Sequence, residues 1–288
     1  MKKFFLLCIT IFLLVACSKE STDYVDETNE QPNVEKQGSD EGNNDIEDKP
    51  NDQDDQTNVE TNDEEPSSVE EVVNTPQYRI NDSTWEIEHI VPADEKLLLL
   101  TIDDAPDKYG LEMATSLKDL GVNAIFFVNG HFIDTDEEKA VLKKIYDLGF
   151  PIGNHTWNHK NLKELSEEDQ YNEIIKLSDE IEAITGERPK FFRAPFGANT
   201  DYAKDIVKND GMILMNWSYG YDFDKNYMTK ESIADIMVNT PLLKKGANLL
   251  MHDREWTYLA LPDIVQGLRD KGYVMADPKL IETIPASK

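Results

Sequence analysis

Short apolar segments that end in a polar or charged residue recur along the chain after about Pro76. We expect each to form a buried strand, because each is only a few residues long and a helix-like segment follows it. They are residues 97–102 ending at Asp103, 124–128 ending at Asn129, 150–153 ending at His155, 191–192 ending at Arg193, 212–215 ending at Asn216 and 248–251 ending at His252.

Segments with helical periodicity lie between the apolar runs, and each stops at a glycine, as helices commonly do. Ser166, with Asp169 three positions later, is typical of a helix N-cap with an acidic first turn. The alternation of strand and helix predicts an α/β fold with parallel strands, whose carboxyl ends gather the reactive residues. The helical segments are 136–148 before Gly149, 166–185 before Gly186, 202–209 before Gly211 and 261–271 before Gly272.

At the N-terminus, Lys2 and Lys3 precede an apolar stretch over 4–15. This stretch is too short for a comfortable membrane-spanning helix and is typical of a secretion signal. It closes on Leu-Val-Ala-Cys at 14–17, which resembles the bacterial lipobox, where the signal is cut before a cysteine that becomes lipidated. We expect a signal peptide at 1–16 and a lipidated Cys17 that anchors the protein at the extracytoplasmic face of the cell membrane. An ordinary cleaved signal is the alternative.

The acidic charge is concentrated between the signal and the apolar runs. Residues 18–75 hold 20 acidic and 3 basic residues, a charge of −17 out of the chain's −28. With scarcely any apolar side chain, this segment cannot offset its ordering entropy, so we expect a disordered acidic linker over 17–75 and one domain over 76–288. The sequence has no basic patch, so a nucleic-acid partner is not expected. Specific binding of cations or basic proteins by the linker is the alternative, and a monomer is expected.

Cys8 and Cys17 are the only cysteines. Since the first would leave with the signal and the second would carry lipid, a metal must bind His, Asp or Glu. His155 and His159 are four positions apart, so we expect them to share one face of a helical turn and to reach one ion. With an aspartate they would suit zinc or another divalent transition ion, with positions open for water and substrate. A structural histidine pair is the alternative.

Three further groups carry potential chemistry. Asp103 and Asp104 follow an apolar run, where alternating side-chain directions would let them serve different tasks, although such pairs also occur in solvated turns. Arg193 has the fixed guanidinium that orients a carboxylate. His252 could donate a proton to a leaving amine.

Four motifs stand in a fixed order: Thr-Ile-Asp-Asp at 101–104, His-Thr-x-x-His at 155–159, Arg-Ala-Pro-Phe-Gly at 193–197 and Leu-x-His at 250–252. Their order and spacing resemble the polysaccharide deacetylases of carbohydrate esterase family 4, the NodB-like domain, over residues 97–277. The resemblance implies a distorted, incomplete (β/α) barrel. It also implies metal-assisted hydrolysis of an N-acetyl group on a glucosamine-type sugar.

Carried over residue by residue, the resemblance implies a role for each motif. Asp104, His155 and His159 look like the metal ligands, with zinc expected and cobalt, nickel or manganese open. Asp103 looks like the base, Arg193 like the residue that holds it, and His252 like the general acid. Leu250 resembles a wall of the acetyl pocket, and the backbone amide of Phe196 resembles the oxyanion donor.

The chain departs from the family pattern at two motifs. Ile102 and Ala105 stand where the family usually has Phe and Gly. The motif that orients the acid histidine and lines the sugar groove fits residues 217–224 only with a shift of one residue. Asp222 with Phe223 is the better match and Asp224 the alternative, while Trp217 and Tyr221 are expected to contact substrate. The weaker candidates are Trp157, Tyr219 and Trp256 as stacking platforms or core residues, His131 as a substrate contact, and Asp253 as a support of His252 or a helix start.

The expected substrate is an amino-sugar polysaccharide. Peptidoglycan is the nearest polymer to a membrane-anchored enzyme, and an exopolysaccharide or chitin fragment is the alternative. Two other function classes stay open: a non-catalytic sugar-binding or wall-tethering lipoprotein, which the irregular motif favours, and a hydrolase of another amide or ester. The intact acid, base and ligand set favours catalysis over binding alone.

Deleting residues 18–75 is expected to leave turnover of soluble oligosaccharides and the melting temperature unchanged, because a disordered charged linker has no packed contacts to lose. Acetate release and thermal unfolding of the truncated protein check this. A large fall in melting temperature would show that the segment belongs to the folded domain.

Overall fold

The computed structural model describes residues 75–284. The predicted signal peptide, Cys17 and all but the last residue of the predicted acidic linker lie outside these residues. None of the helices in the described range combines the length and the apolar composition that a membrane span requires.

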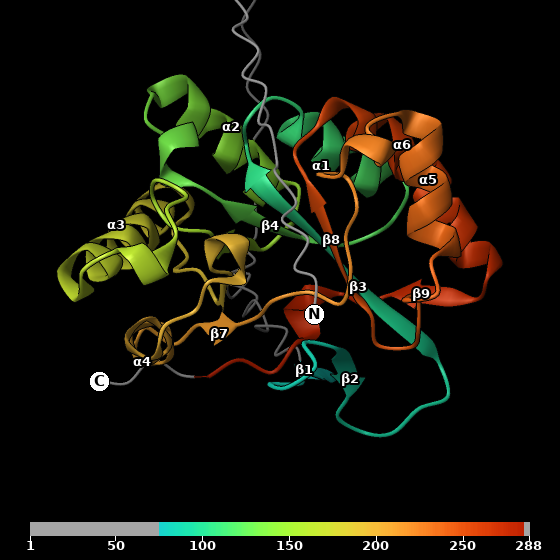
Figure 1. The fold of residues 1–288 in the computed structure, drawn as a ribbon, viewed down its shortest axis with the longest axis horizontal. Coiled ribbons are helices and arrows are strands. Elements are labelled where there is room, and N and C mark those ends of the chain that lie inside the picture. The colour runs from blue at the N-terminus through green and yellow to red at the C-terminus, as the bar shows by residue number, and fades with distance from the viewer. Residues whose placement is uncertain (1–74, 285–288) are drawn as a thin grey trace, which may run out of the picture. The chain divides into compact units, whose positions relative to one another are not determined.

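Seven parallel strands form one sheet in the order β7-β6-β5-β4-β3-β8, and β9 pairs with the start of β3 (Figure 1). The predicted alternation of strand and helix is confirmed, since helices connect successive strands and pack outside the sheet. The strands are β3 (Lys96–Ala105), β4 (Ile125–Val128), β5 (Ile152–Asn154), β6 (Phe191–Phe192), β7 (Ile213–Leu214), β8 (Asn248–His252) and β9 (Tyr273–Met275).

The sheet curls into a half-barrel, as expected, and its closure is irregular. In the described residues no strand pair joins β7 to β8; the chain after β7 instead reaches β8 through one isolated bridge between Tyr219 and Leu249. The amide of Leu250 donates to the carbonyl of Tyr219 at 2.8 Å. A Cβ at Gly220 would lie 2.5 Å from the carbonyl oxygen of Leu250, so only glycine permits this close approach.

The helices follow the sequence signals in most places. Ser166 accepts a hydrogen bond from the amide of Asp169, and Gly186 ends the same helix with φ 83°. The predicted start of the last helix at residue 261 is wrong: α6 begins at Glu255 and continues through Pro262, a residue that usually occupies a first helical turn. The helices are α1 (Gly110–Asp119), α2 (Asp136–Asp147), α3 (Glu167–Thr185), α4 (Asp201–Asn209), α5 (Lys230–Asn239) and α6 (Glu255–Asp270).

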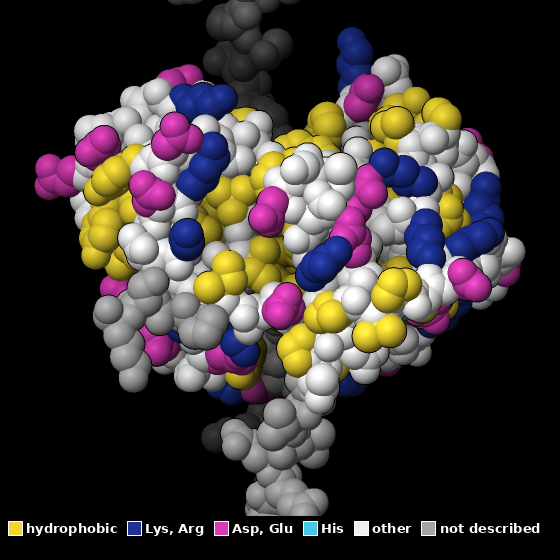
Figure 2. Space-filling view, turned by 90° about the horizontal axis from the view of Figure 1, so that it is seen from below, with side chains coloured by type: hydrophobic (Ala, Val, Ile, Leu, Met, Phe, Trp, Pro, Cys, Tyr) yellow, Lys and Arg dark blue, Asp and Glu magenta, His cyan; other side chains and the backbone are white. Residues whose placement is uncertain are grey.

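Two apolar layers flank β3, because its side chains alternate between the two faces of the sheet. Leu98 and Leu100 pack against the surrounding helices, whereas Leu97 and Leu99 pack with Phe127 and other residues inside the half-barrel. The hairpin of β1 (Tyr78–Ile80) and β2 (Ile87–His89) contributes to the interior cluster and lies below the sheet in Figure 1. Figure 2 views the molecule from that side and shows acidic and basic side chains interspersed. The candidate site residues lie at the other end of the sheet, where strands such as β3 and β8 finish with Asp103, Asp104 and His252.

Leu100→Ala is expected to lower the free energy of unfolding by about 2–5 kcal/mol, because truncation of this buried side chain leaves a cavity in the middle of the sheet. The matched control is Leu259→Ala on α6, whose side chain is 46% exposed; its effect should stay within about 0.5 kcal/mol. Urea denaturation measures both. Equal losses would contradict the placement of β3 at the centre of the core.

Candidate active site

The end of β3 separates two adjacent carboxylates. The pairing of β3 with β4 shifts register between Ile102 and Ala105, and Asp104 has a left-handed backbone with φ 61°. A bulge of this kind re-aims side chains. Asp103 bonds to Arg193, while Asp104 lies beside His155 and His159. The expectation that the two acids face different partners therefore has a backbone cause.

His155 and His159 lie in the loop after β5, so the predicted helical turn is wrong. Two residues of this loop have positive φ, Thr156 at 69° and His159 at 53°, and these turns bring the imidazoles together. The side chain of Asn154 accepts a hydrogen bond from the amide of Thr156 at 2.9 Å, and Glu173 on α3 accepts one from a loop amide at 2.7 Å. Neighbouring elements thus hold a conformation that a helix would not give.

Asp104, His155 and His159 each offer a ligand atom within 4.8 Å of the other two. Oδ1 of Asp104 is 3.5 Å from Nε2 of His159 and 3.9 Å from Nε2 of His155. Nδ1 of His155 donates to the carbonyl of Arg193 at 2.7 Å, which leaves its Nε2 lone pair free for a metal. Two imidazoles and one carboxylate fit a divalent transition ion and leave coordination positions open.

The charges around the cluster favour ligand-competent forms. Burial raises the pKa of Asp104, but the three neighbouring histidines and Arg254 outweigh it, so the pKa lies below its usual value. Burial, and then the charge of His155, lowers the pKa of His159. Both shifts favour an ionised carboxylate and a neutral imidazole, which are the forms that bind metals.

Arg193 lies wholly buried inside the half-barrel and holds Asp103. Its Nη1 donates to Oδ1 of Asp103 at 2.6 Å and to Oγ1 of Thr101 at 2.8 Å, and its Nη2 donates to the carbonyl of Asn216 at 2.9 Å. Its guanidinium also lies 4.4 Å from the ring centre of Phe127. The other oxygen of Asp103 is 3.5 Å from Nε2 of His155, so the carboxylate faces the ligand cluster.

His252 ends β8 directly opposite Asp103 in the strand register. Asp222, which is fully buried, accepts hydrogen bonds from the amide of His252 at 2.6 Å and from its Nδ1 at 2.7 Å. Burial lowers the pKa of His252, but the charge and hydrogen bond of Asp222 outweigh it and raise the pKa above its usual value. Asp224, the alternative partner, instead caps a short helix through the amide of Asn226.

The candidate substrate residues lie in different settings. The Phe196 ring is 67% exposed and lies 4.9 Å from that of His159. Leu250 is buried on β8. Trp217 lies 5.8 Å from the guanidinium of Arg193, and the hydroxyl of Tyr221 bonds to Thr240 at 2.6 Å.

The weaker candidates are mostly tied into the structure. Tyr219 is buried and donates to the carbonyl of Met237, so stacking on a sugar is excluded for it. Trp256 donates to the carbonyl of Asp222 at 2.9 Å. A lysine ammonium lies 3.4 Å above the ring of Trp157, and Nδ1 of His131 lies 3.1 Å from the carbonyl of Trp157.

Sequence reasoning missed two supporting contacts after β8. Asp253 accepts hydrogen bonds from the amides of Lys108 and Tyr109 at 3.2 and 2.7 Å, which holds the loop after β3. Arg254 donates to Oδ2 of Asp104 at 2.8 Å. No local sequence signal marks either contact, because each joins residues about 145 to 150 positions apart.

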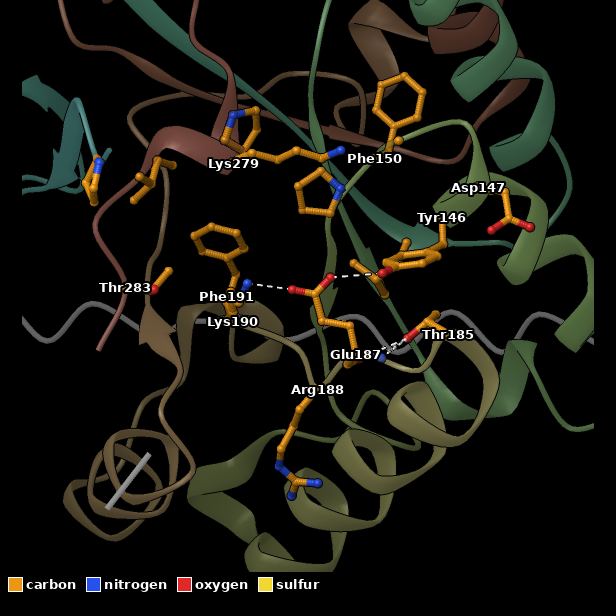
Figure 3. A pocket seen from close by; sticks show the side chains of 16 residues that line it. Tyr146, Asp147, Phe150, Thr185, Glu187, Arg188, Lys190, Phe191, Lys279 and Thr283 are labelled. Carbon is orange, nitrogen blue, oxygen red and sulfur yellow. Dashed lines mark hydrogen bonds and ion pairs between the residues drawn. The ribbon is translucent and has the colours of Figure 1, made fainter. Parts of the chain in front are cut away.

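A cavity of about 620 Å³ lies at the opposite ends of β5 and β6, and none of the candidate residues lines it. Figure 3 shows Glu187 between Lys190 and Tyr146 in this cavity, bonded to them at 2.5 and 3.0 Å. Glu187 and Lys190 of this cavity are thus already paired with each other.

The chain is similar to several known deacetylases. The family model for polysaccharide deacetylase matches residues 90–215. Two peptidoglycan-N-acetylglucosamine deacetylases of Bacillus cereus are 27% and 32% identical, over 63% and 66% of this chain and 66% and 88% of their own lengths. The peptidoglycan-N-acetylmuramic acid deacetylase PdaC of Bacillus subtilis is 29% identical over 68% of this chain. The match spans only 41% of the length of PdaC.

Solved structures share the fold. T48 deacetylase, solved with substrate, superposes with a TM-score of 0.59 at 27% identity, covering 67% of this chain and 95% of its own. A CE4 family pseudoenzyme of Bacillus anthracis superposes with a TM-score of 0.58 at 26% identity, covering 65% of each chain. With a 32% identical relative matched over 88% of its length, the chain belongs to the polysaccharide deacetylases of carbohydrate esterase family 4, the NodB-like domain.

Proposed function

We propose that the protein is a metal-dependent hydrolase that removes N-acetyl groups from an amino-sugar polymer. One observation carries the proposal: the three-ligand cluster lies beside Asp103, and His252 faces Asp103 across the strand pair. The proposed base, acid and metal ligands thus come together at one end of the sheet, from the ends of β3, β5 and β8, and they are the set that amide hydrolysis needs.

Each residue has a defined task in this reaction. A divalent metal held by Asp104, His155 and His159 would polarise the amide carbonyl and lower the pKa of a water molecule. Asp103, fixed by Arg193, takes the proton of the attacking water. His252, held by Asp222, gives a proton to the nitrogen as the carbon–nitrogen bond breaks, so that acetate and a free amine leave. The amide of Phe196 would bind the developing oxyanion.

The proposed substrate is peptidoglycan. This proposal is supported by the similar relatives, which are deacetylases of N-acetylglucosamine or N-acetylmuramic acid in that polymer. Leu250 would wall the acetyl pocket, and Trp217 and Tyr221 would contact the sugar. Lipidation of Cys17 at the cell surface would place the domain beside the wall, which fits this substrate.

A non-catalytic binding role is the second candidate, because a pseudoenzyme has a similar fold. Acetate release from acetylated chito-oligosaccharides and from peptidoglycan, with and without a chelator, separates the candidates. Release that stops with chelator and returns with zinc supports the deacetylase. Binding of glycan without release would support the pseudoenzyme role, and cleavage of other amides or esters alone would support a different hydrolase.

Asp103→Asn is expected to lower kcat by about 10² to 10⁴, the contribution of a positioned base, while bound metal per chain stays unchanged. Asp104→Asn should instead weaken metal binding, because it replaces an anionic ligand with a neutral one. Metal content by mass spectrometry and steady-state kinetics measure the pair. Equal metal loss in both variants, or full activity in Asp103→Asn, would mean that the two roles are wrong.

Asp222→Asn is expected to shift the alkaline limb of the pH–rate profile to lower pH. Asp222 raises the pKa of His252, and the protonated imidazole is the acid, so activity is lost as pH rises through that pKa. Without the carboxylate charge the pKa falls and the loss begins earlier. Asp224→Asn is the matched control, since Asp224 bonds elsewhere, and it should leave the limb in place. A shift of the same size in both variants would contradict the role of Asp222.

A further inference from the structure

Three successive residues, the last of β8 and the two that follow it, bond to three different parts of the site. His252 bonds to Asp222, Asp253 holds the loop after β3, and Arg254 reaches back to Asp104. Arg254 is the N-cap residue of α6, so its backbone is fixed where strand and helix meet. The turn therefore links the proposed acid to a proposed metal ligand.

The two carboxylate oxygens of Asp104 have different neighbours, and Arg254 bonds to only one of them. Its Nη2 donates to Oδ2 at 2.8 Å, whereas Oδ1 is the oxygen near both imidazoles. Its Nη1 donates to the carbonyl of Asp253 at 2.8 Å and lies 3.8 Å from Asp107. Its side chain is 34% exposed, so the group is anchored on one side and open to solvent on the other.

We propose that Arg254 is a positioning residue that holds Asp104 so that one oxygen alone faces the metal. This inference rests on the metal site of the proposed function. The terminal torsion of an aspartate has broad, roughly two-fold preferences, so an unanchored carboxylate could rotate or bind through both oxygens. A charge-assisted hydrogen bond to Oδ2 removes that freedom before the metal arrives.

The positive charge of Arg254 also opposes a nearby cation. That effect is moderated here, because the guanidinium lies beside two carboxylates, Asp104 and Asp107, and is open to solvent. Loss of a hydrogen-bonding partner behind a ligand typically costs about 10- to 100-fold in metal affinity. Positioning is therefore expected to outweigh repulsion.

The test compares Arg254→Ala, Arg254→Lys and the remote control Arg79→Ala by competition of each purified protein with a chromophoric chelator for zinc. Arg79 pairs with Glu88 on the hairpin, away from the site. Arg254→Ala should bind zinc about 10- to 100-fold more weakly, Arg254→Lys should recover part of the loss, and Arg79→Ala should match the wild type. The visible spectrum of the cobalt-loaded protein should change in Arg254→Ala alone, which a general loss of stability would not produce.

Different outcomes would overturn the proposed metal site and the positioning role of Arg254. A wild-type protein that binds neither zinc nor cobalt would overturn the proposed function itself. If the wild type binds metal but Arg254→Ala binds it equally or more tightly with an unchanged cobalt spectrum, the positioning role alone is wrong. Circular dichroism of each variant establishes that affinity is compared between folded proteins.

Discussion

The buried ion pair of Arg193 and Asp103 is the interaction on which the rest of the site depends. The same arginine fixes Asp103, accepts the Nδ1 hydrogen of His155 through its carbonyl, and bonds to Asn216 where the sheet closes irregularly. Removing one partner of such a pair leaves an uncompensated buried charge, which typically costs about 3–5 kcal/mol. The proposed base, one ligand and the closure of the half-barrel are thus coupled through one residue.

The second constraint is backbone geometry. Five non-glycine residues in the described range have positive φ, and four of them, Asp104, Thr156, His159 and Phe196, lie at the site. Each such residue typically costs about 1–3 kcal/mol and persists only where the surroundings enforce it. Here Asn154 and Glu173 supply hydrogen bonds that hold the histidine loop. The strain converges on the ligand cluster, which is where function requires an uncommon geometry.

Much of this arrangement was predictable because buried strands carry continuous apolar runs and their ends carry polar residues. The strand-end positions of Asp103, His155, Arg193 and His252 follow from that pattern. The conformation of the histidine loop does not follow from the sequence pattern. The spacing of four residues favours a helix, whereas Thr156 and His159 turn the chain with positive φ. Contacts such as Arg254 with Asp104 depend on the packing of distant elements, which a local pattern does not encode.

The bulge at the end of β3 sends Asp103 to Arg193 and Asp104 to His155 and His159, and we infer that only Asp104 binds the metal. A crystal structure of the zinc-loaded protein, with the ion located by anomalous scattering, tests this most directly. We expect zinc bound by Asp104, His155 and His159, with Asp103 bonded to Arg193 and outside the coordination sphere. Zinc bound by Asp103, or located away from these residues, would contradict it.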